Sequence, residues 1–145
     1  MSARPPLARP REMSDEDAEL LGRAQDLLRE RYLEGRHEVA AAFRLSDGRI
    51  VTGIHVDGSA RRSAVCAEGV AAGNAIAAAA GAQVVAAVSV LRRATGEEHL
   101  IEPCGVCAEM LSDYWPDARV WVTVGDDSVA STFAGLLPVK RRRAW

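Results

Sequence analysis

The chain has 145 residues, of which 48% are hydrophobic and 26% are charged, and its formal net charge is -2. This length suits one hydrophobic core, and the composition is ordinary for a globular protein. The slightly acidic balance argues against a protein that grips a nucleic-acid backbone. The longest apolar-biased stretch, residues 70–90, is too often interrupted by glycine and polar residues to span a membrane. We therefore expect neither a nucleic acid nor a membrane as partner.

The first residues of the chain lack the apolar segment of a secretory signal. Residues 1–12 contain three prolines and three arginines, so we expect a disordered or loosely held arm over residues 1–13. A main domain over residues 14–140 and a basic C-terminal tail over residues 141–145 would follow. Without a secretory signal we expect a cytoplasmic protein, in which clustered cysteines bind metal more often than they form disulfides.

The first half of the main domain predicts a helix and then a β-hairpin. Ser14 is a suitable N-cap, three acidic residues follow it, and an apolar stripe continues until the helix fades near residues 33–35. The runs 38–45 and 49–56 have the pattern of strands. Because Ser46-Asp47-Gly48 joins them, we expect a tight turn between two antiparallel strands.

The second half predicts alternating helices and strands. A helix rich in small residues should run over about 64–80, followed by a buried strand over 83–91. Pro103 suits the first position of a helix that ends near Tyr114. A further buried strand is expected over 119–124 and a short helix over about 128–134. This order predicts an α/β fold with a mixed sheet.

The placement of the three cysteines is the most informative feature of the sequence. Cys66 lies at the start of one predicted helix, and Cys104 and Cys107 form a C-x-x-C at the start of another, directly after Pro103. Helix N-termini favour thiolates, and zinc is the metal that suits such ligands. Three protein ligands leave a fourth position for water, as a hydrolytic site requires.

Glu68 completes a recognisable pattern because it stands two residues after Cys66. A carboxylate that does not bind the metal itself can move protons between water and a leaving group. Three ligands, a separate glutamate and a P-C-x-x-C segment together are typical of zinc deaminases. We therefore predict Zn²⁺ held by the three cysteines, and Glu68 as the catalytic proton shuttle.

At these motifs the sequence resembles the small tetrameric cytidine deaminases and, among them, looks most similar to the blasticidin-S deaminases. The resemblance extends to the predicted hairpin, residues 39–42 and 46–53, and to Leu136-Leu137-Pro138. It implies a three-layer α/β/α fold with a five-stranded mixed sheet. It also implies a homotetramer that removes an exocyclic amine from a cytosine-like nucleoside.

The chain departs from these relatives where they bind substrate. In place of an Asn-x-Glu pair it has His55-Val56-Asp57, and in place of a phenylalanine it has His37. We expect His55, Asp57 and His37, with the backbone of Ala67, to contact the substrate. The altered positions favour a substrate other than unmodified cytidine, such as a modified nucleoside or a blasticidin-S-like molecule.

Two arginines that lie near the thiolates in these relatives are also replaced, by Gly69 and Ala108, and Glu109 follows in place of glutamine. Three thiolates on Zn²⁺ sum to -1, which calls for compensating donors. Our hypothesis is that Arg61 or Arg62 supplies one.

Two other interpretations remain open. The chain could be a zinc-stabilised binding module that has lost catalysis, with His99 as the best candidate for a fourth ligand. It could also act on a polynucleotide, although the charge balance speaks against this. Residues 140–143 form a basic run that usually belongs to a solvated tail, but a tail ending in Trp145 could also reach a neighbouring active site.

Overall fold

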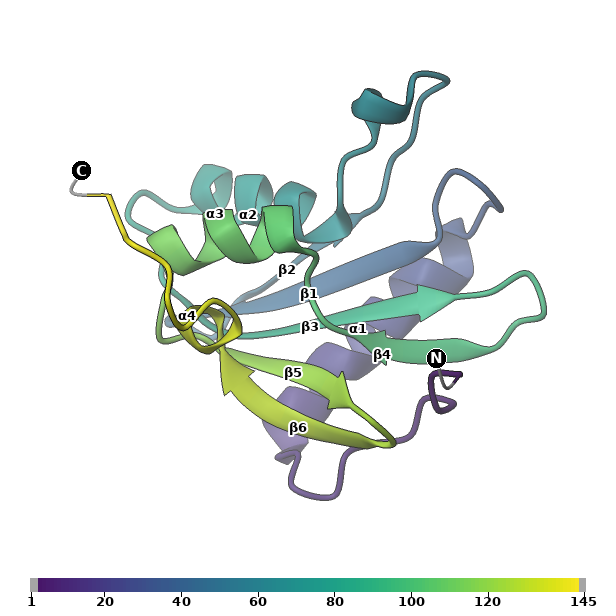
Figure 1. Ribbon diagram of the computed structural model, residues 1–145, viewed down its shortest axis with the longest axis horizontal. Helices are drawn as coiled ribbons and strands as arrows, with labels where there is room; N and C mark the ends of the chain where they lie inside the picture. The colour runs from purple at the N-terminus through teal and green to yellow at the C-terminus, as the bar shows by residue number, and fades with distance from the viewer. Residues whose placement is uncertain (1–2, 144–145) are drawn as a thin grey trace.

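The computed structural model describes residues 3–143, apart from the side chain of Arg61. One mixed sheet lies between helices (Figure 1). The helices are α1 (Asp15–Arg31), α2 (Ala67–Ala78), α3 (Gly105–Tyr114) and α4 (Phe133–Leu136), with a short 3-10 turn at Arg61–Ser63. The strands are β1 (Val39–Leu45), β2 (Ile50–Ile54), β3 (Val84–Arg92), β4 (Glu98–Ile101), β5 (Arg119–Val124) and β6 (Asp127–Thr132).

Strand β3 is the centre of the sheet. It pairs with β1 along one edge, and its other edge pairs with β4 in its second half and with β5 in its first half. Among the strands of the described residues only the β3–β5 pairing is parallel, so the sheet is mixed as predicted. The described residues contain six strands and not five, because the short β4 forms a separate hairpin with β3.

The predicted helix over residues 128–134 is wrong for most of its length. Residues 127–132 form β6, which pairs antiparallel with β5, and the helical residues begin at Phe133. The connection is the two-residue turn Gly125-Asp126, in which Gly125 has a φ of 63°. Glycine reaches this left-handed conformation without steric cost, so the turn reverses the chain into a strand.

Alternate residues of β1 enter two different cores. Ala40 and Ala42 pack with α1, whereas Ala41 and Phe43 pack on the opposite face with α2 and α3. This alternation follows from the two-residue repeat of a strand. The predicted three-layer α/β/α architecture is therefore confirmed, and Figure 1 shows α1 behind the sheet.

The hairpin and α2 fit closely together because of one glycine. The predicted β1–β2 turn is confirmed, with Gly48 at a φ of 91°. On β2, a Cβ atom added to Gly53 would lie 2.3 Å from the carbonyl oxygen of Ala67 and 2.4 Å from the backbone nitrogen of Ala71. The bare backbone of Gly53 thus lets the first turns of α2 lie directly against β2.

Residues 4–7, part of the arm predicted to be loose, lie against β4 and the residue that follows it. The backbone N–H of Leu7 donates to the carbonyl oxygen of Glu98 (2.7 Å), and the ring of His99 donates to the carbonyl oxygen of Pro5 (2.8 Å). Leu7 and Met13 also pack against the core under α1. Apolar side chains and an available strand edge account for this docking.

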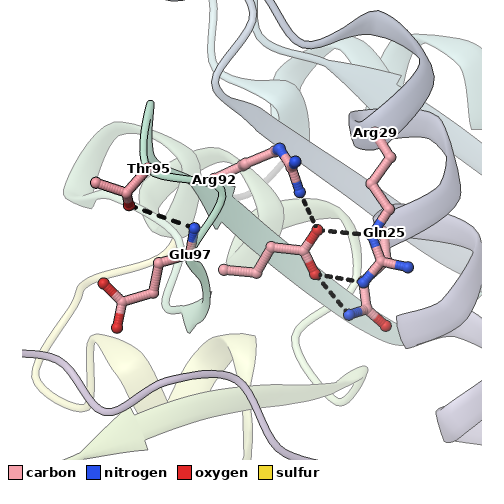
Figure 2. A network of polar contacts seen from close by, with 6 residues as sticks. Gln25, Arg29, Arg92, Thr95 and Glu97 are labelled. Carbon is pink, nitrogen blue, oxygen red and sulfur yellow. Dashed lines mark hydrogen bonds and ion pairs between the residues drawn. The ribbon is translucent and has the colours of Figure 1, made fainter.

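The carboxylate of Glu98 ties β4 to α1. It accepts hydrogen bonds from Gln25 (2.7 Å), Arg29 (2.8 Å) and Arg92 (2.8 Å), and Figure 2 shows the three donors converging. These bonds, from Arg29 above all, hold the pKa of Glu98 below its ordinary value although burial opposes them. The start of β4, beside which the arm lies, is thereby fixed.

Among the described residues, no helix is long and apolar enough to cross a membrane.

Candidate metal centre and active site

The three cysteine thiols lie together at the N-termini of two helices. Cys66 is the N-cap of α2, Cys104 is the N-cap of α3, and Cys107 follows in the first turn of α3. All three sulfur atoms lie within 4.8 Å of one another, and those of Cys66 and Cys104 are 3.5 Å apart. Tetrahedral zinc–sulfur bonds of about 2.3 Å place sulfur atoms about 3.8 Å apart, so this donor set fits zinc.

The helix boundaries differ slightly from those predicted. Residues before Cys66 are extended because Val65 pairs with Val56, so α2 begins at Ala67. Pro103 precedes the N-cap of α3 and does not occupy the first helical position. Cys66 and Cys104 therefore stand at the N-terminal ends of α2 and α3, where backbone N–H groups lack partners within the helix.

The protein environment acts differently on the three thiols. Burial raises the pKa of Cys66, and burial with the nearby charge of Glu68 raises the pKa of Cys107. Burial also opposes ionisation of Cys104, but the backbone N–H group of Cys107 and the thiols of Cys66 and Cys107, with a smaller contribution from the N–H of Val106, together outweigh it and lower the pKa of Cys104. The N–H of Cys107 is 3.5 Å from this sulfur. A bound cation would deprotonate all three thiols.

Glu68 is buried beside this cluster, with 3% of its surface exposed. It lies in the first turn of α2, and its Oε1 accepts a hydrogen bond from the hydroxyl group of Ser89 on β3 (2.8 Å). Burial raises the pKa of Glu68, and the Ser89 hydrogen bond opposes that rise. A carboxyl group whose pKa is raised toward neutrality is suited to give and take protons.

A pocket of about 390 Å³ adjoins the thiols and Glu68. Its volume lies in the range of small-molecule binding sites. The pocket is lined by the arm, by the ends of β1 to β4 and by the starts of α2 and α3: Arg4, Glu38, Val39, His55, Cys66, Ala67, Glu68, Leu91, Ile101, Glu102, Pro103 and Cys104.

The four predicted substrate contacts divide into two groups. His55 and Ala67 line the pocket, whereas His37 and Asp57 are not among its lining residues. Both of these contact His55: the ring of His37 donates to its carbonyl oxygen (2.9 Å), and Asp57 Oδ2 lies 3.7 Å from its Nε2. The backbone N–H of Glu38 donates to the Nδ1 of His55 (3.4 Å). The ring of His55 is thus held from several sides.

The suspected fourth ligand does not join the cluster. His99 is buried next to the arm and bonded to Pro5, and among the described residues the cysteine group contains no fourth His, Cys, Asp or Glu. The three-cysteine set therefore leaves a coordination position open, as a hydrolytic site requires.

Two other residues singled out in the sequence, Arg62 and Glu109, do not line the pocket. Arg62 is exposed, and the side chain of Arg61 lies outside the described residues, as does Trp145. Glu109 is paired with Lys140, at 3.3 Å, on the outer side of α3. Lys140, the last residue of the main domain, thus contacts α3 directly before the tail begins.

Sequence reasoning missed several residues around the pocket. Glu38, Glu102 and Arg4 line it, and Ser89 binds Glu68. Glu102 could have been noticed because it directly precedes Pro103-Cys104. No local signal distinguishes Arg4 from the other arginines of the arm, or marks Ser89 within an apolar strand.

Comparison with known proteins agrees with this geometry. The family model of the cytidine and deoxycytidylate deaminase zinc-binding region matches residues 14–123. A blasticidin-S deaminase from Bacillus cereus is 31% identical over 136 residues, which cover 90% of this chain and 96% of that protein.

Solved cytidine deaminases have the same fold. The enzyme from Bacillus anthracis is similar with a TM-score of 0.74 and 25% identity, covering 88% of this chain and 89% of that one. The enzyme from Mycobacterium leprae gives a TM-score of 0.68 and 26% identity, over 87% and 99% of the two chains. By its motifs, its fold and its relatives, the chain belongs to the cytidine and deoxycytidylate deaminase family and is a zinc-dependent hydrolytic deaminase.

Proposed function

We propose that this chain removes the exocyclic amine from a cytosine-like nucleoside, either cytidine or a blasticidin-S-like molecule, and releases ammonia. One observation carries the proposal: the buried carboxyl group of Glu68 lines the same pocket as the thiols of Cys66 and Cys104. A proton carrier and a metal site therefore face a single space that a small ring can enter.

In this proposal Cys66, Cys104 and Cys107 hold the zinc. When bound, zinc supplies Lewis acidity that brings water toward ionisation near neutral pH. Glu68 takes a proton from the attacking water as the new C–O bond forms at the ring carbon that bears the amine. The same carboxyl group passes this proton to the ring nitrogen, and then carries the remaining proton of the new hydroxyl group to the amine, so that the C–N bond breaks, ammonia leaves and a carbonyl group remains.

His55 and Ala67 are the proposed direct contacts of the substrate, because both line the pocket. The backbone of Ala67 lies between Cys66 and Glu68 and can orient the ring. His37 and Asp57 are assigned a supporting role, because each contacts His55 and neither lines the pocket.

The mechanism is tested with two variants that separate metal binding from catalysis. Cys104→Ala should lose zinc and activity. Glu68→Ala should keep zinc and lose turnover by at least about 100-fold, as expected for a general acid–base group. Metal analysis and an ultraviolet assay measure the two quantities. Full activity in Glu68→Ala would exclude the proposed mechanism.

The substrate is identified by the same assay over cytidine, deoxycytidine, cytosine and blasticidin S. The Bacillus cereus relative is a blasticidin-S deaminase, and the solved relatives are cytidine deaminases. The replacement of the usual Asn-x-Glu pair by His55-Val56-Asp57 favours the modified nucleoside. Equal or better turnover of cytidine than of blasticidin S would reject that preference.

We also propose a cytoplasmic homotetramer. Apolar side chains that are open to solvent in the single chain support association: Val106 on α3 is 79% exposed, and Tyr114 at the end of α3 is also exposed. The three unpaired thiols suit a reducing compartment. Sedimentation equilibrium tests the oligomer, and a monomer at micromolar concentration would exclude it. Cell fractionation tests the location.

A further inference from the structure

We propose that the N-terminal arm forms one wall of the active site, and that Arg4 binds the oxygen-bearing sugar attached to the reacting ring. This inference rests on the proposed deaminase function and extends it. It assigns a substrate contact to a segment that lies outside the residues matched by the family model, which begin at residue 14.

The arm is attached to β4 and the residue that follows it at three successive points. Leu7 donates to Glu98, Pro5 accepts from His99, and Arg4 forms a two-point ion pair with Glu102. In the ion pair Nη1 of Arg4 lies 2.8 Å from Oε2 of Glu102, and Nη2 contacts Oε1. This part of the arm therefore runs alongside β4 in the opposite direction, and Arg4 is the residue of the arm that lines the pocket.

The strand that carries these contacts is itself firmly held. Glu98 is bonded to α1 through Gln25 and Arg29, as Figure 2 shows for the two donors. Glu102 stands two residues before Cys104, so the ion pair lies next to the metal site in the chain. The guanidinium of Arg4, paired with the residue that follows a fixed strand, keeps a defined position, because a two-point contact restricts its rotation.

The location of Arg4 determines which part of a substrate it meets. The reacting carbon must lie at Cys66, Cys104 and Glu68, and the pocket is larger than a single six-membered ring needs. In the sheet order β2-β1-β3-β4, His55 follows β2 and Glu102 follows β4. The substituent on the ring thus extends into the space between the His55 side and the Arg4 side.

The charges around Arg4 determine the chemistry of that substituent. Glu102 neutralises the guanidinium and accepts two of its hydrogen bonds, which leaves further N–H donors free of that contact. Glu38 adds a second carboxylate to the lining. An uncharged hydroxyl or ring oxygen can accept from these donors, whereas a phosphate would meet both carboxylates. The site therefore fits a nucleoside and disfavours a nucleotide.

Arg4→Ala tests the contact, and Arg9→Ala is the matched control. Arg9 belongs to the same arm and is also ion-paired, to Asp15 at 2.7 Å, but it does not line the pocket. Steady-state kinetics are measured on the best nucleoside substrate of the wild-type enzyme. Loss of a charge-assisted hydrogen bond should raise KM about 10-fold in Arg4→Ala while kcat stays within about threefold. In Arg9→Ala both values should equal those of the wild type.

Arg4→Lys keeps the charge without the two-point contact, so its KM should lie between those of wild type and Arg4→Ala. It also answers the question if Arg4→Ala does not fold. The inference is overturned if KM in Arg4→Ala or Arg4→Lys equals that of Arg9→Ala, or if the wild type prefers a nucleoside 5′-monophosphate. A wild-type enzyme that deaminates no member of the panel would instead overturn the proposed function itself.

Discussion

Gly53 is the position where a single methyl group should disturb the active site from a distance. In Gly53→Ala the new Cβ would lie 2.3 Å from the carbonyl oxygen of Ala67 and 2.4 Å from the nitrogen of Ala71. Both atoms belong to the backbone of α2, so the clash is relieved only if the helix and the strand separate by about 1 Å, toward ordinary contact distances. Such overpacking costs about 1–3 kcal/mol. For a chain of this size that corresponds to a fall in Tm of about 3–10 °C.

The separation should also affect the metal, because Cys66 and Glu68 lie at the end of the helix that must move. We expect Gly53→Ala to bind zinc more weakly and to lose kcat as well as stability. Gly73→Ala is the control: Gly73 lies within α2, a Cβ there meets no atom within 4 Å, and alanine is the better helix former. That variant should be as stable as the wild type or more stable by about 0.5–1 kcal/mol.

The assay is urea unfolding of the zinc-loaded protein at one fixed protein concentration, since metal and oligomer both shift apparent stability. Zinc content after dialysis against a weak chelator gives the second readout. If Gly53→Ala unfolds at the same urea concentration as Gly73→Ala and retains zinc equally well, the close contact between Gly53 and α2 does not limit the packing of the helix, and the reasoning is refuted.

Two further predictions concern buried polar groups. Asp17 is 1% exposed and accepts hydrogen bonds from Trp121 and Arg119. Because the side chain of Arg119 is 45% exposed and can rehydrate, Asp17→Asn should lower the free energy of unfolding in urea at pH 7 by about 2 kcal/mol. Burial opposes ionisation of Asp17, but these hydrogen bonds hold its pKa below 3.8. The stabilisation by the ionised Asp17 is therefore complete above the pKa of the unfolded state and is lost as the pH falls through the pKa of the folded state. The gap in unfolding free energy between wild type and variant should thus narrow below about pH 4, and a constant gap would contradict this account. Ser89→Ala removes the hydroxyl group that holds Glu68, so kcat should fall about 10-fold with zinc content unchanged; an unaltered kcat would show that Ser89 has no part in placing Glu68.

Short-range features of the chain were predictable because neighbouring residues decide them. Asp47-Gly48 specifies a hairpin turn, since glycine alone adopts its positive φ without cost. Cys66 and Glu68, or Cys104 and Cys107, are brought together by one turn of helix, so the motif already implies metal and proton chemistry. The turn at Gly125-Asp126 carries a comparable signal: Gly125 reverses the chain into an antiparallel strand, and for this reason the helix predicted over residues 128–134 is wrong for most of its length.

Contacts between distant segments were not predictable in this way. Arg4 and Glu102 are 98 residues apart, and Ser89 and Glu68 are 21 apart; neither pair leaves a periodic pattern in the sequence. The same holds for the arm, whose prolines and arginines have the composition of a loose segment although β4 offers it a place to dock. Such pairs depend on which strand edges and helix ends meet, and only packing of the whole chain decides that.

The sequence by itself therefore determined the reaction type, through three cysteines and a glutamate at set spacings, and the layered α/β architecture, through the order of its apolar segments. Only the tertiary structure decided that His99 stays out of the metal cluster and that Ser89 holds Glu68. It also decided that Arg4 lines the pocket. The physical reason is the range of the interactions: helix ends and turns are set by adjacent residues, whereas a pocket is walled by side chains that folding alone brings together.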